Sequence, residues 1–91
     1  MNPKALLIAY AREIGLNTKH TAGGCMALSL ETSGNNEILI TDDGDIPTSL
    51  GQDDCIMGVY DEYGQCILTK HGRAIDLISL VSSLSDEVTA E

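Results

Sequence analysis

Three cysteines and two histidines are among the side chains of this chain that could supply a nucleophile, a base or a soft metal ligand. Cys25 could pair with His20 or His71, but the sequence assigns no third group to orient the base and no oxyanion site. Cys55 and Cys66 fall in predicted strands, on the face predicted to be buried, where a thiol behaves as a small hydrophobe. The spacing of the histidines and Cys25 matches no paired metal-binding motif. We therefore expect no enzymatic activity, no metal site and no cofactor.

The acidic segment TDDGDIP, which begins at Thr41, invites comparison with a calcium-binding loop. An EF-hand loop that started at Asp43 would need an oxygen ligand at its fifth position and a glycine at its sixth. The sequence has Pro47 and Thr48 at those positions, and strands rather than helices are predicted on both sides. Because Asp and Gly are also the residues that ordinary turns favour, we predict a turn here.

The acidic residues are segregated from the basic ones along the chain. Between His20 and Thr69 there are nine carboxylates and no lysine or arginine, and the formal net charge of the chain is -9 at pH 7. Such a charge disfavours direct binding to nucleic acid or to an anionic membrane, and it favours basic partners. Solubility is the alternative explanation, because a small domain tolerates a high net charge. The carboxylates expected to contact a partner, and to mimic a row of phosphates, are Asp42, Asp43, Asp45, Asp53, Asp54, Asp61 and Glu62.

Composition limits the size and the setting of the protein. Its 91 residues suffice for one domain, and 43% hydrophobic residues with clear periodicity predict a folded chain. No apolar run approaches the ~20 residues that a membrane span needs. Arg12 and Glu13 interrupt the apolar stretch near the start, so no signal peptide is expected. An odd number of widely spaced cysteines predicts reduced thiols and a cytoplasmic location.

The spacing of apolar residues predicts an α+β fold, in which a four-stranded antiparallel meander lies between two helices. The first helix is predicted over residues 3–15, with Asn2 as its N-cap and Gly15 at its end. The polar segment 16–24 is expected to be a loop. The remaining predicted elements are the strands CMALSL, EILIT, DCIMGVY and QCILT within residues 25–69, a second helix over residues 72–84, and a frayed tail over residues 85–91.

The hydrophobic pattern selects a register for each hairpin. A three-residue loop at 34–36 would place Leu30 opposite Ile40. A type I turn with a glycine bulge in the last hairpin would place Val59 opposite Cys66. In these registers one face of the sheet is almost entirely apolar. The predicted core is Leu28, Leu30, Ile38, Ile40, Cys55, Met57, Val59, Cys66 and Leu68.

The opposite face of the sheet is predicted to be mixed. It carries Leu39, Ile56, Tyr60 and Ile67 among polar side chains, and Ser29 lies on the same face, where substitution by alanine should cost little if that face is exposed. The second predicted helix is also apolar around more of its circumference than a surface helix needs. A helix or a partner could cover these residues, so a homodimer is possible.

The segments TAGGCMALSL, EILITDDGDIP and GVYDEYGQ lie within residues 21–65, and with them the chain resembles small uncharacterised proteins of phages and prophages. In size and acidity it resembles the anti-CRISPR and other anti-defence inhibitors that phages make. These resemblances imply a viral protein that acts in the host cytoplasm. It would bind a host protein or ribonucleoprotein complex and occupy a basic, nucleic-acid-binding surface. They imply no catalytic residues. The alternative is a small homodimeric structural or assembly subunit without catalytic activity.

Overall fold

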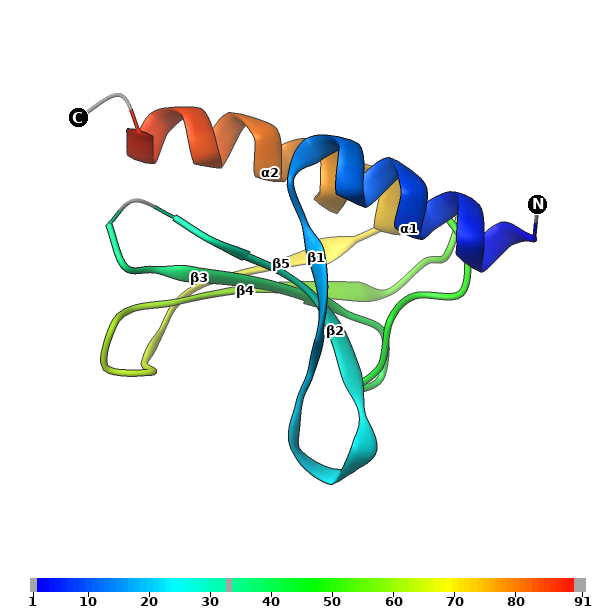
Figure 1. Ribbon diagram of the computed structural model, residues 1–91, viewed down its shortest axis with the longest axis horizontal. Helices are drawn as coiled ribbons and strands as arrows, with labels where there is room; N and C mark the ends of the chain where they lie inside the picture. The colour runs from blue at the N-terminus through cyan, green and yellow to red at the C-terminus, as the bar shows by residue number, and fades with distance from the viewer. Residues whose placement is uncertain (1, 33, 90–91) are drawn as a thin grey trace.

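Two helices cover one face of an antiparallel sheet in the computed structural model, which describes residues 2–32 and 34–89 (Figure 1). Within those residues, five strands form one sheet in the order β1-β2-β3-β4-β5, which is a simple meander. The predicted α+β class is therefore confirmed. The elements are α1 (Pro3–Ile14), β1 (Asn17–His20), the 3-10 helix η1 (Ala22–Gly24), β2 (Met26–Glu31), β3 (Glu37–Thr41), β4 (Cys55–Tyr60), β5 (Cys66–Gly72) and α2 (Ala74–Thr89).

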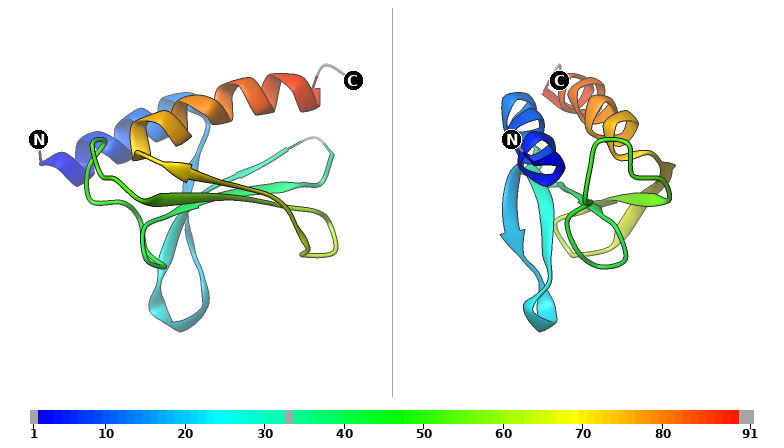
Figure 2. Two further views of the ribbon diagram at one scale, coloured as in Figure 1. Left: turned by 180° about the vertical axis from the view of Figure 1, so that it is seen from behind. Right: turned by 90° about the vertical axis from the view of Figure 1, so that its right-hand side faces the viewer.

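Strand β1 lies where the sequence predicted a loop, so the prediction of four strands is wrong. It pairs antiparallel with β2, with Asn17 opposite Ser29 and His20 opposite Met26. Together β1 and β2 form a ribbon that bends away from the helices (Figure 2). Because β1 is an edge strand of four residues with little burial, its sequence NTKH lacks the apolar alternation that identifies a strand.

Helix α1 begins and ends as its sequence predicts. The side chain of Asn2 accepts a hydrogen bond from the backbone N–H of Ala5 (2.7 Å), which caps the first turn. Gly15 takes the left-handed conformation (φ 115°) that ends the helix, at no steric cost to a glycine. Leu7 and Ala11 are fully buried and form the stripe that packs toward the sheet.

Helix α2 differs from its prediction at both ends. Strand β5 continues through Gly72, so the helix begins at Ala74 rather than at residue 72. The backbone N–H of Ala74 donates to the carbonyl of Gln52 (3.0 Å), so the loop before β4 satisfies an N–H group that the helix leaves unpaired. The helix then continues through Thr89, because no glycine or proline interrupts the sequence there. The end of the helix was predicted at residue 84 and lies at Thr89, while the fraying of residues 85–91 stays a prediction and residues 90–91 lie outside the described residues.

The core lies between the sheet and the helices, and most of the predicted core residues are found there. Those that are buried are Leu28, Ile38, Ile40, Cys55, Met57 and Val59. Leu30 and Leu68 are partly buried and pack against them. The helices contribute Leu7, Ala11, Ala74, Leu77, Ile78 and Val81. Within the described residues, no helix is long and apolar enough to cross a membrane.

The β2–β3 pairing is shifted by two residues from the predicted register, so that Leu30 lies opposite Ile38 rather than Ile40. The turn causes this shift, since Asn35 takes the left-handed conformation (φ 65°) and the backbone of Thr32 closes the loop. A shift of two keeps each side chain on its predicted face, because the side-chain period of a strand is two. The core residues of both strands therefore stay on the helix side.

Cys66 is the predicted core residue that the structure exposes. It lies opposite Tyr60 instead of Val59, and a β-bulge after that pair brings Leu68 opposite Val59. The extra residue in the bulge is Ile67, which is 55% exposed. The bulge separates Cys66 from the core side while it returns Leu68 to that side. The prediction for Cys66 is wrong because the apolar run Cys66–Leu68 does not reveal which of its residues bulges.

Candidate functional site

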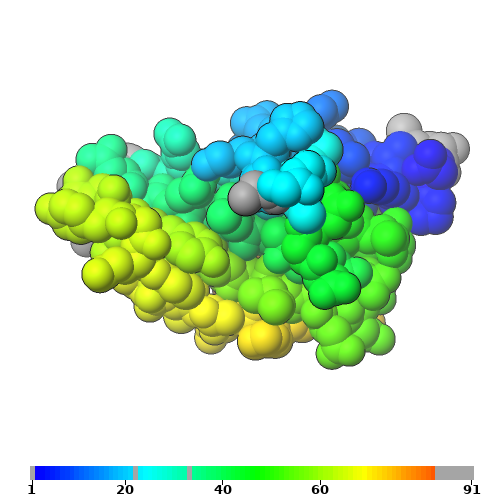
Figure 3. Space-filling view, turned by 90° about the horizontal axis from the view of Figure 1, so that it is seen from below, coloured from blue at the N-terminus to red at the C-terminus, as the bar shows by residue number. Residues whose placement is uncertain are grey.

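The face of the sheet that the helices do not cover, which we call the open face, has acidic residues at both of its ends. In a meander, the β2–β3 and β4–β5 turns lie at one end of the sheet and the β3–β4 loop at the other. Figure 3 shows the open face, with the β4–β5 turn at one end and the β3–β4 loop at the other. The structure therefore divides the predicted contact residues. Asp42, Asp43, Asp45, Asp53 and Asp54 lie at the β3–β4 end, and Asp61 and Glu62 lie at the opposite end.

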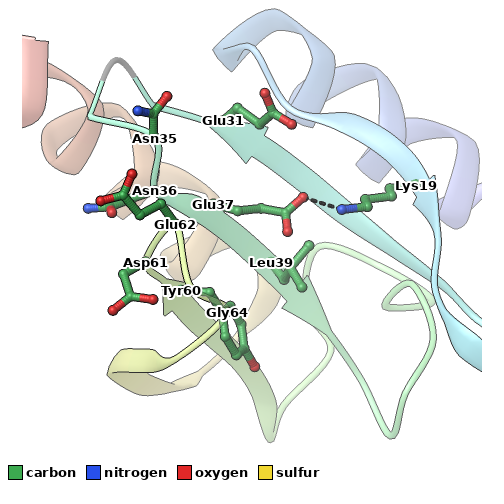
Figure 4. Close-up of a pocket in the computed structure, with 10 residues that line it drawn as sticks. All are labelled: Lys19, Glu31, Asn35, Asn36, Glu37, Leu39, Tyr60, Asp61, Glu62 and Gly64. Atoms are coloured by element: carbon green, nitrogen blue, oxygen red, sulfur yellow. Dashed lines mark hydrogen bonds and ion pairs between the residues drawn. The ribbon is translucent and has the colours of Figure 1, made fainter.

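At the second of these ends the structure forms an open groove of about 570 Å³, here called the acidic groove. Two carboxylates that the sequence did not single out, Glu31 and Glu37, join Asp61 and Glu62 there. The turns at both hairpin ends form its walls, and side chains of β3 and β4 form its floor (Figure 4). The lining residues are Lys19, Glu31, Asn35, Asn36, Glu37, Leu39, Tyr60, Asp61, Glu62 and Gly64.

Glu37 is the carboxylate at the centre of the hydrogen bonds in this groove. It lies directly opposite Glu31 across β2 and β3, a like-charge pair that would by itself destabilise the sheet. The ammonium group of Lys19 forms an ion pair with Glu37 Oε2 (Figure 4). Ser29 Oγ donates to the same oxygen at 3.1 Å. Lys19 belongs to β1, so the strand that the sequence did not reveal supplies the cation of the groove.

Ser29 is buried rather than exposed, with 7% of its surface accessible. It lies opposite Asn17 of β1 and Leu39 of β3, which flank it on both sides. Exposure of Ser29 was expected only for an uncovered face, and β1, which the sequence did not predict, lies beside β2. Because β1 pairs with β2, the side chain of Ser29 instead holds Glu37 in place.

Tyr60 and Leu39 form an apolar floor in the groove. Leu39 lies opposite Gly58, and a Cβ built on Gly58 would come within 2.8 Å of Tyr60 Cε2 and 2.9 Å of its hydroxyl oxygen. The Cε2, Cζ and hydroxyl oxygen atoms of Tyr60 therefore lie over Gly58 and fill the space that a side chain at position 58 would occupy. The ring is half-buried, and it forms part of the groove lining.

The wall at the β4–β5 turn is fixed by Asp61. Its Oδ1 accepts hydrogen bonds from the backbone N–H groups of Tyr63 and Gln65, each at 2.9 Å. Gly64 has the positive φ (82°) that a type I turn with a glycine bulge requires. Asp61 is therefore a turn-forming residue as well as a charge, whereas Glu62 is exposed beside it.

The acidic residues at the β3–β4 end also form a turn. Asp42 and Asp45 exchange backbone hydrogen bonds of 2.6 and 3.1 Å around Asp43 and Gly44, whose φ angles of 52° and 86° are those of a type I′ hairpin turn. The predicted turn is confirmed. Within the described residues, no group of three or more His, Cys, Asp or Glu side chains is placed to hold a metal ion.

The three cysteines are free thiols that differ in burial. Burial, and then the charges of nearby aspartates, raise the pKa of the Cys55 thiol to about 11, so that it stays protonated at neutral pH. Cys25 is half-buried beside the β3–β4 turn, 4.0 Å from a Cβ built on Gly44. His71 lies on β5, at the opposite edge of the sheet from β1 and His20.

Comparison with known proteins adds no relative: no family model, no curated protein and no solved structure matches this chain.

Proposed function

We propose that this chain is a small acidic protein-binding module that occupies a basic, nucleic-acid-binding surface of a host protein or ribonucleoprotein complex. In this proposal it is a phage-encoded inhibitor of the anti-CRISPR type and acts in the host cytoplasm. The observation that carries the proposal is the open face, which has carboxylates at both of its ends and a groove at one of them. Among the described residues that line this groove, Lys19 is the one basic residue, and it is already paired with Glu37.

The two acidic ends define the spacing that a partner must match. Asp54 and Asp61 flank β4 and are seven positions apart in the sequence. At a rise of ~3.3 Å per residue, the two ends are roughly 23 Å apart. The carboxylates thus form two clusters rather than one continuous row. A partner with two basic patches at this distance, such as the two walls of a nucleic-acid channel, would engage both clusters at once.

Charge attraction of this kind makes binding fast and sensitive to salt. The Debye length is ≈ 10 Å at 0.1 M salt and 3 Å at 1 M, so exposed carboxylates lose most of their long-range attraction as salt rises. The test is to immobilise the chain and apply a host lysate that contains nucleic-acid-processing complexes, at low salt. We expect a basic complex to be retained and to elute with salt and also with added competitor nucleic acid.

Two matched variants assign the binding to one end or both. Glu31→Gln with Glu62→Gln removes two of the four carboxylates that line the groove and leaves the Asp61 turn intact. Asp43→Asn with Asp53→Asn removes two of the five aspartates at the other end, and asparagine tolerates the left-handed φ of position 43. We expect each pair to weaken retention. Failure to retain any basic complex at low salt, or retention that nucleic acid does not reverse, would refute the proposal.

A homodimeric structural or assembly subunit is the second candidate, and strand β5 is the observation that favours it. This strand is an edge of the sheet, with free backbone groups along seven residues, and Ile67 on it is 55% exposed. Unpaired edges are templates for pairing with another chain. A dimer would be detected by light scattering, and Ile67→Lys should abolish it. A monomer at every accessible concentration would exclude this candidate.

A further inference from the structure

Of the two acidic ends of the sheet that the structure describes, only one combines an aromatic ring with the surrounding carboxylates. In the acidic groove, the outer part of the Tyr60 ring lies over Gly58, and Tyr60 lines the groove together with four carboxylates. At the β3–β4 end, the aspartates surround a turn whose neighbouring apolar residues, Ile46 and Pro47, are buried. The two ends therefore present similar charge but different chemistry. The difference is an aromatic face beside carboxylates, which is the environment that binds a cation of planar shape.

The groove already holds a cation from the chain itself. Lys19, on the short edge strand β1, extends its ammonium group to Glu37 Oε2, while about half of its side-chain surface remains accessible at 47%. An ion pair with this much exposure contributes little to stability and exchanges easily. Lys19 therefore occupies the position that a cation from a partner would take, and it can leave that position at low cost.

We propose that the acidic groove receives an arginine side chain of the partner, with its guanidinium group stacked on the Tyr60 ring and hydrogen-bonded to Glu37, in place of the Lys19 ammonium group. Arginine fits better than lysine because its planar guanidinium stacks on an aromatic face and donates to a carboxylate through two parallel N–H groups. The ammonium of lysine is a compact and strongly hydrated charge, and gains less from the ring. This inference rests on the proposed function and specifies the chemistry of the partner.

The test uses two synthetic peptides, hexa-arginine and hexa-lysine, titrated into the ¹⁵N-labelled protein at low salt and followed by NMR. Shifts of the backbone amides of Glu37, Tyr60 and Gly64 report on the groove, and those of Asp43 and Asp54 report on the other end. At the groove we expect hexa-arginine to bind about two- to fivefold more tightly than hexa-lysine, the ratio that one exposed cation–π contact supplies. At the β3–β4 end we expect equal affinities.

Three substitutions separate stacking from charge. Tyr60→Phe keeps the ring and should keep the arginine preference, whereas Tyr60→Leu should remove it while both peptides still bind. Lys19→Met removes the internal cation and should tighten the binding of both peptides at the groove, which a purely structural Lys19 would not do. Equal affinities in the unaltered protein, or an arginine preference that survives Tyr60→Leu, would overturn the inference.

Failure of this inference is distinguishable from failure of the proposed function. If the basic complex is retained and released by nucleic acid, but the groove shows no preference for arginine, only the arginine site is wrong. If the peptides behave as expected but no basic complex is retained at low salt, the proposed inhibitory role is wrong and the groove remains an arginine-binding site.

Discussion

Gly58→Ala is a substitution whose effect follows from a single contact. The added Cβ would lie 2.8 Å from Tyr60 Cε2 and 2.9 Å from its hydroxyl oxygen, closer than real Cβ contacts come. Gly58 is not among the glycines with positive φ, so its backbone accepts alanine without strain. The clash with the ring is therefore the main cost, and the half-buried ring can relieve it by swinging away from the sheet into solvent.

The expected change in unfolding free energy combines the cost of the clash with the gain from replacing glycine by alanine in a strand. Overpacking and loss of the ring's contacts cost about 1–3 kcal/mol in typical proteins, and an outward path for the ring favours the lower part of that range. When the ring is absent, the same change should have the opposite sign. Alanine is favoured over glycine inside a strand by roughly 0.5–1 kcal/mol, because glycine loses more conformational freedom on folding. In a Tyr60→Ala background, Gly58→Ala should therefore be neutral or stabilising.

The assay is a double-mutant cycle by urea denaturation, with the unaltered protein, both single variants and the double variant. We expect a coupling free energy between positions 58 and 60 of about 1–3 kcal/mol, within the range for residues in direct contact. The fluorescence of Tyr60 in Gly58→Ala should also indicate that its ring is more exposed to solvent. An equal cost of Gly58→Ala in the two backgrounds would show that the ring does not lie over position 58, and the floor of the groove would then be misassigned.

Three further measurements test the fold around the site. At mild alkaline pH, a thiol reagent should modify exposed Cys66 rapidly while buried Cys55 is protected, whereas equal rates would contradict the β-bulge register. Because burial raises the pKa of Cys55 from its ordinary value of 9.0 to about 11, the folded state is favoured below pH ~9. That stabilisation, about 2–3 kcal/mol of unfolding free energy, is lost as the pH rises to ~11. Cys55→Ala should flatten that part of the stability profile, and an unchanged slope would contradict the burial of the thiol. In denaturation experiments, Ile40→Ala should lower the free energy of unfolding by about 2–5 kcal/mol, because it leaves a cavity in the core. Ile67→Ala, at an exposed position, should change it by no more than ~0.5 kcal/mol.

Side-chain polarity was sufficient to predict the elements that have one buried face. Strands β2, β3 and β4 carry apolar residues at every second position, on the face that packs against the helices, and Leu28, Ile40 and Met57 were assigned to the core on that ground. The capping residues Asn2 and Gly15 fixed the bounds of α1 to within one residue. In each case a local physical preference and the global packing favour the same conformation.

The elements that polarity could not predict are those at the margins of the sheet. Strand β1 is largely exposed, so NTKH has the composition of a loop, and only its pairing with β2 makes it a strand. The bulge at Ile67 changes which residue of an apolar run is exposed, and no residue type encodes that choice. The burial of Ser29 follows from β1, since a side chain on the second strand is covered when the first strand is present.

The division of the acidic residues could have been predicted from the meander alone. Consecutive turns of an antiparallel meander lie at alternate ends of the sheet, so the turns after β2 and β4 share one end and the loop after β3 lies at the other. A count of carboxylates along the sequence places Asp54 and Asp61 in one group, although the whole of β4 separates them. Topology instead joins Asp61 to Glu31 and Glu37, which are distant in sequence and share the groove. What the sequence could not supply is the cation, because Lys19 reaches Glu37 only through the unpredicted strand.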